Sequence, residues 1–155
     1  MPELRTAYHE AGHCVMAVML GAIVEVATVD PDRDDRQQRW GDVQIRWNSS
    51  QNWRSQALVA LAGPAAEAVF LQQPLHPGFV EEWAEDWKIA WELSKIASKV
   101  DKKRLALLER VSAELYQVFN QDKVWNAVAA LADELLAHET IYQEEIEETV
   151  RFWMG

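Results

Sequence analysis

The sequence predicts an α+β fold, mainly α, with a small sheet of two or three strands inserted after the first helix. Apolar residues recur at three- and four-residue spacing along most of the chain, as they do on one face of a helix. Residues 24–29 and 41–47 have the composition of strands instead. The chain has 155 residues, of which 49% are hydrophobic. That length allows one core and is short for two, so residues 1–155 are expected to form a single domain.

The first helix is expected to begin at Pro2, which suits a first helical turn, and to end before Gly21, a typical C-terminal cap. Residues 24–29 follow as a strand, and the polar residues 32–39 read as a surface loop. In residues 41–47, Val43, Ile45 and Trp47 alternate with polar side chains. This alternation predicts a half-buried strand at a sheet edge, either an ordinary edge or one that receives a substrate peptide as an added strand.

The rest of the chain reads as helices. Ser49 or Ser50 is expected to cap a helix that Gly63-Pro64 breaks or restarts before it ends near residue 71. Residues 74–78 form a connector. Asp101 and Asp122 are candidate caps for two later helices. The remaining helices are expected over residues 79–98, 102–119, 122–137 and 143–152.

Composition narrows the classes of function. A net charge of −10 repels phosphate backbones, so nucleic acid binding is not expected. A single cysteine, Cys14, cannot form an internal disulfide, and it reads as a buried inert thiol. We see no secretory signal and no apolar run long enough for a bilayer, so a soluble, cytoplasmic protein without a membrane span is expected. The tryptophans at positions 83, 87 and 91 form a helical stripe that packs in the core or against a partner.

One motif carries specific chemistry, His9-Glu10-Ala11-Gly12-His13. Two histidines four residues apart project from one face of a helix and can bind one zinc ion together. Glu10 is placed to take a proton from a metal-bound water, which then attacks a peptide carbonyl. The plain alternative is a pair of surface histidines with an incidental glutamate.

A catalytic zinc site needs a third protein ligand. Four downstream residues are candidates: Glu67, Asp86, His76 and His138. His76 lies between prolines in a predicted loop, and His138 lies near a helix C-terminus, where the helix dipole alone favours it. Glu67 and Asp86 both lie on predicted helices, and chemistry alone does not separate them.

The chain resembles the peptidase domain of the FtsH-type membrane AAA proteases. Residues 6–13, Thr-Ala-Tyr-His-Glu-Ala-Gly-His, are very close to that family's zinc signature. Residues 61–67, 85–93, 132–140 and 144–146 resemble later segments of the family in the same order. The resemblance implies that His9, His13 and Asp86 are zinc ligands and that Glu10 is the general base. It leaves Glu67 as a supporting or packing residue.

The sequence departs from that family in several places. It contains no phosphate-binding loop of an ATPase, and Glu85 and Pro64 replace an asparagine and an arginine. We therefore expect a zinc-dependent endopeptidase that cleaves unfolded or flexible polypeptides without its own ATPase. The alternative is a zinc-binding pseudo-peptidase that acts as a protein-interaction module; a helical domain with a vestigial motif is the third reading. Beyond a polypeptide substrate, the partners would be further copies of this chain or a separate protein.

Overall fold

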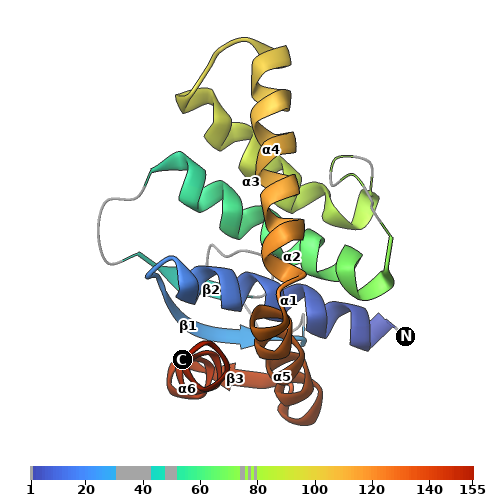
Figure 1. Cartoon of the computed structure of the whole chain (residues 1–155), viewed down its shortest axis with the longest axis vertical. Coiled ribbons are helices and arrows are strands. Elements are labelled where there is room, and N and C mark those ends of the chain that lie inside the picture. Colours follow the sequence, from blue (N-terminus) through green and yellow to red (C-terminus); the bar gives the residue numbers. More distant parts are fainter. Residues whose placement is uncertain (1, 31–42, 48–51, 74–75, 77, 79) are drawn as a thin grey trace.

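The computed structural model describes residues 2–30, 43–47, 52–73, 76, 78 and 80–155. It is mainly helical, with a small antiparallel sheet, which confirms the fold class predicted from the sequence (Figure 1). The elements follow one another in this order: α1 (Pro2–Met19), β1 (Ile23–Thr28), β2 (Val43–Arg46), α2 (Trp53–Leu71), η2 (Glu81–Trp83), α3 (Ala84–Leu93), η3 (Ser94–Ile96), α4 (Asp101–Phe119), α5 (Asp122–His138), β3 (Thr140–Tyr142) and α6 (Gln143–Met154).

Helix α1 lies at the centre of the molecule, between α2 and the sheet, and also packs against α5 (Figure 1). It ends as predicted, because Gly21 follows it with a φ of 87°, a conformation that glycine adopts without strain. Gly12 lets α1 approach α2 closely. A Cβ atom there would lie 2.5 Å from Ala66 Cβ and 2.6 Å from the carbonyl oxygen of Ala62. The small residues of both helices therefore bring the motif on α1 against α2.

The sheet has the strand order β2-β1-β3, so β2 is an edge strand as predicted. Ala27 of β1 pairs with Val43 on one side and with Ile141 on the other. The third strand does not follow α1 in sequence, because β3 lies between α5 and α6. Residues 32–39 and 41–42 lie outside the described residues.

The prediction that Gly63-Pro64 interrupts a helix is wrong, because α2 continues through Pro64. Every residue of α2 from Ala57 to Ala68 is buried. Burial on all sides outweighs the hydrogen bond that a proline removes from the helix. The cap is Asn52, whose side chain accepts a hydrogen bond from the Ser55 amide at 2.7 Å. Ser49 and Ser50 lie outside the described residues.

The later helices differ from the prediction mainly at their ends. The segment expected to be helical over residues 79–98 is the ten-residue α3 between two short 3₁₀ turns, η2 and η3. Asp101 and Asp122 do not cap α4 and α5; each is the first residue of its helix, where the helix dipole favours a negative charge. The last helix, α6, is capped by Tyr142 and Glu145 in a capping box.

The predicted tryptophan stripe divides into two environments. Trp83 is buried, whereas Trp87 and Trp91 are half-buried and stack with ring centroids 6.3 Å apart. The guanidinium of Arg104 lies 4.0 Å from the centroid of the Trp91 ring, in a cation–π contact.

None of the described helices combines the length and the apolar character needed to span a bilayer.

Candidate metal centre

His13 presents an unpartnered nitrogen toward the interior of the protein. Its Nδ1–H donates to the carbonyl oxygen of Val59 at 2.8 Å, and a carbonyl can only accept, so this bond fixes the tautomer of the ring. The side chain is fully buried, and its Nε2 has no hydrogen-bond partner. A buried nitrogen without a hydrogen bond is costly, and a metal ion between it and the Asp86 carboxylate 3.3 Å away would satisfy it.

Asp86, in the first turn of α3, faces both motif histidines. Its Oδ2 lies 2.8 Å from His9 Nε2 and 3.3 Å from His13 Nε2. A tetrahedral zinc ion bonded at about 2.0 Å keeps its ligand atoms about 3.3 Å apart, so these separations are close to those of a metal site. Within the described part of the chain, His9, His13 and Asp86 are the group whose ligand atoms could share one ion, all within 4.8 Å of one another.

Glu67 lies on the other side of the His9 ring. Its Oε1 accepts from His9 Nδ1 at 2.9 Å and from the indole Nε1–H of Trp83 at 2.9 Å. Its Oε2 accepts from Arg5 Nε at 2.8 Å. Glu67 therefore orients His9 so that Nε2 points at Asp86, an arrangement typical of a carboxylate that supports a metal-binding histidine.

The other two candidate ligands lie elsewhere. His76 Nε2 is 3.5 Å from a carboxylate oxygen of Glu109, and its ring lies beside Trp87. His138 is exposed at the end of α5. The structure therefore separates Glu67 from Asp86, which side-chain chemistry alone could not do, and brings neither His76 nor His138 into the ligand group.

The charges of the site depend on one another. Burial favours the neutral ring of His9, but hydrogen bonds to Asp86 and Glu67 outweigh it and raise the pKa of His9 to about 10. Burial likewise opposes the charge of Asp86, but the facing rings of His13 and His9 hold its pKa well below the ordinary value. Without a metal, His9 therefore carries a proton between two carboxylates, and a metal ion would displace the proton on Nε2.

Glu10 lies on α1 next to His9 and is only 4% exposed. Its negative charge contributes to the raised pKa of His9. Burial, with a smaller contribution from Glu10, raises the pKa of the Cys14 thiol well above its usual range. Cys14 is thus a buried, protonated thiol, in line with its interpretation as inert.

Gly63 makes room for the Nε2 atoms of His9 and His13, a role that the sequence did not indicate. A Cβ atom at this position would collide with His13 Nε2 and lie 2.7 Å from His9 Nε2. The sequence predicts a helix break at Gly63, and it carries no signal for the contacts of Arg5 and Trp83 with Glu67. Two imidazoles and one carboxylate, with space held open beside them, form a donor set that fits zinc.

Access to this site is narrow. His9 is the most exposed of the three candidate ligands, with 11% of its side chain accessible, whereas Asp86 is almost fully buried. A separate cleft of about 630 Å³ lies where the end of α2 meets α4 and α5, and Tyr116, Gln72 and Trp125 are among its lining residues. That cleft does not include the candidate ligands.

No protein-family model matches the chain, and no curated protein matches its sequence significantly. The functional proposal therefore depends on the motif and on the geometry around it.

Proposed function

We propose that this protein is a zinc-dependent metalloendopeptidase that hydrolyses peptide bonds in unfolded or flexible polypeptides without an ATPase of its own. The observation that supports the proposal is the convergence of His9 Nε2, His13 Nε2 and Asp86 Oδ2, with Glu10 buried beside them. The resemblance of residues 6–13 to the FtsH-type zinc signature adds to it.

In this proposal His9, His13 and Asp86 hold the ion. Bound zinc supplies a Lewis acid that polarises a peptide carbonyl and makes water a better nucleophile near neutral pH. Val59 and Glu67 each accept the Nδ1–H of one histidine, so both rings keep Nε2 directed at the site.

Glu10 would carry the proton. Its carboxylate takes a proton from the attacking water while the carbon–oxygen bond forms. It then delivers that proton to the amide nitrogen as the carbon–nitrogen bond breaks. A carboxylate in this position reaches the attacking water without being a metal ligand itself. The motif therefore places Glu10 next to His9 but not on the helix face that the two histidines share.

The burial of the site favours a second candidate, a zinc-binding pseudo-peptidase that acts through protein interaction. Glu10, His13 and Asp86 are each no more than 4% exposed. A peptide carbonyl must reach the same centre, whereas a structural zinc needs no access. Both candidate functions require bound zinc, and they differ in whether the protein cleaves a peptide.

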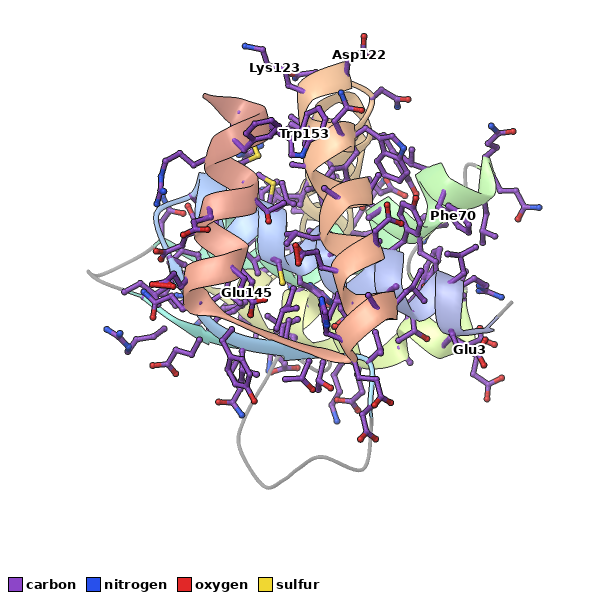
Figure 2. All side chains as sticks on the ribbon, turned by 90° about the horizontal axis from the view of Figure 1, so that it is seen from below. Glu3, Phe70, Asp122, Lys123, Glu145 and Trp153 are labelled. Carbon is purple, nitrogen blue, oxygen red and sulfur yellow. The ribbon has the colours of Figure 1, made fainter. Side chains whose placement is uncertain are left out.

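The test compares wild type with Glu10→Gln, using zinc-loaded protein, an unfolded protein substrate and no ATP. Glu3→Gln is the matched control, because Glu3 is an exposed glutamate on the same helix (Figure 2). We expect wild type and Glu3→Gln to cleave, and Glu10→Gln to bind zinc but not to cleave. Zinc binding without cleavage by any of the three would favour the pseudo-peptidase, and cleavage by Glu10→Gln at the wild-type rate would refute the mechanism.

A further inference from the structure

One short segment of this acidic protein carries a net positive charge. Residues 93–104 contain five basic side chains and one acidic side chain, a net charge of +4, which leaves −14 for the rest of the chain. The segment includes η3 and the start of α4. Four of its basic residues are exposed lysines: Lys95, Lys99, Lys102 and Lys103.

The same segment exposes large apolar side chains. Ile96 is 72% exposed and Val100 is 52% exposed, and Leu105, near the start of α4, is 39% exposed. Isolated exposed apolar residues are common, but a group of them among lysines is the composition of a surface that meets a partner. We call the exposed side chains of residues 95–105 the basic tip.

The basic tip forms one end of the molecule. In Figure 1 the connection between α3 and α4 lies at the top of the long axis, and the C-terminal helix lies at the bottom. The shape is a protruding turn between two helices, as suits insertion into a deformable surface. Within the described part of the chain, Lys99, Lys102 and Lys103 form no ion pair.

The stability of α4 does not explain these lysines. Lys102 and Lys103 lie in the first turn of α4, where the helix dipole disfavours positive charge. The one buried basic residue of the segment, Arg104, is accounted for by its hydrogen bond to Ser94 at 2.9 Å and its contact with Trp91. Lys95 pairs with Glu92 at 2.7 Å, but Lys99, Lys102 and Lys103 have no corresponding role in folding.

We propose that the basic tip docks this protein onto the surface of an anionic lipid bilayer. Lysine ammonium groups would contact the lipid phosphates, and Ile96 and Val100 would enter the boundary between headgroups and acyl chains. The acidic remainder of the chain would point away from the membrane. At physiological salt the Debye length is about 8 Å, so the acidic body beyond that distance is largely screened from the anionic surface. This inference does not depend on the metal centre.

The experiment is flotation of the full-length protein with vesicles of phosphatidylcholine containing about one third phosphatidylglycerol, beside vesicles of phosphatidylcholine alone. We expect flotation with the anionic vesicles, loss of most of it when NaCl rises from about 0.1 to about 0.5 M, and none with the neutral vesicles. Lys102→Glu should weaken partitioning roughly 30-fold, because it removes one attraction and adds one repulsion of similar size. Ile96→Gln should weaken it by roughly fivefold, since that side chain would no longer insert.

Two variants serve as matched controls. Lys123 follows Asp122 at the start of α5 as Lys102 follows Asp101 at the start of α4, so Lys123→Glu makes the same change of charge on a different face (Figure 2). Phe152, 75% exposed on α6, is the apolar control through Phe152→Gln.

Both controls should float like wild type. The proposal would be overturned if the protein bound neutral vesicles as well as anionic ones, or did not bind anionic vesicles at all. It would also be overturned if Lys102→Glu and Lys123→Glu weakened binding to anionic vesicles equally. A salt-sensitive self-association that Lys102→Glu abolishes in the absence of vesicle binding would overturn it as well.

Discussion

Replacing Glu67 tests whether this carboxylate supports a ligand or is itself a ligand. In the structure it accepts hydrogen bonds from His9 Nδ1 and Trp83 Nε1, both at 2.9 Å, and from Arg5. Glu67→Gln keeps the shape of the side chain but turns one acceptor oxygen into an NH₂ group, which must face a donor. Loss of such a supporting group typically weakens metal binding by about 10- to 100-fold, or about 1.4–2.7 kcal/mol.

Competition with a chromophoric chelator measures the zinc dissociation constant of each variant. We expect the loss stated above for Glu67→Gln, and for Asp86→Asn a loss of more than about 100-fold, because a charged ligand disappears. Glu25→Gln is the control, since Glu25 also pairs with an arginine, Arg46, but on the exposed surface. If Asp86→Asn bound zinc normally and Glu67→Gln did not, Glu67 would be the third ligand. That result would refute the assignment of Asp86 as a ligand.

Three further predictions follow from the same site. Gly63→Ala should abolish stoichiometric zinc binding, measured by elemental analysis, because its Cβ would occupy the space beside His13 Nε2 and His9 Nε2; one zinc per chain in this variant would contradict the packing. Zinc affinity, measured by chelator competition, should rise about tenfold per pH unit between about pH 6 and 8. The reason is that zinc must displace one proton from His9, whose pKa is raised to about 10. An affinity that does not change with pH would show that no proton is displaced. Trp83→Phe removes one donor to Glu67 and should weaken zinc binding by less than Glu67→Gln does, whereas an equal loss would mean that packing of Trp83 dominates.

The sequence predicted local features well. Pro2 and Gly21 marked the ends of α1, and the four-residue spacing of His9 and His13 put both on one helix face, because these signals act within a few residues. The edge position of β2 followed from the alternation of Val43, Ile45 and Trp47.

The features that sequence could not predict depend on packing between distant segments. Apart from the family resemblance, nothing in the sequence separates Glu67 from Asp86, because the packing of α2 and α3 decides which carboxylate faces Nε2 of both histidines. The continuity of α2 through Pro64 depends on its burial on every side. Strand β3 has three residues, too few for a periodic pattern, and forms only because Ile141 pairs with Ala27 far away in the chain.

Anomalous diffraction at the zinc edge from crystals of the zinc-loaded protein would locate the ion and identify its ligands. We expect one ion bonded at about 2.0–2.1 Å to His9 Nε2, His13 Nε2 and a carboxylate oxygen of Asp86, with Glu67 still bound to His9 Nδ1. An ion held by Glu67 in place of Asp86, or zinc bound only at surface residues away from α1, would contradict the account.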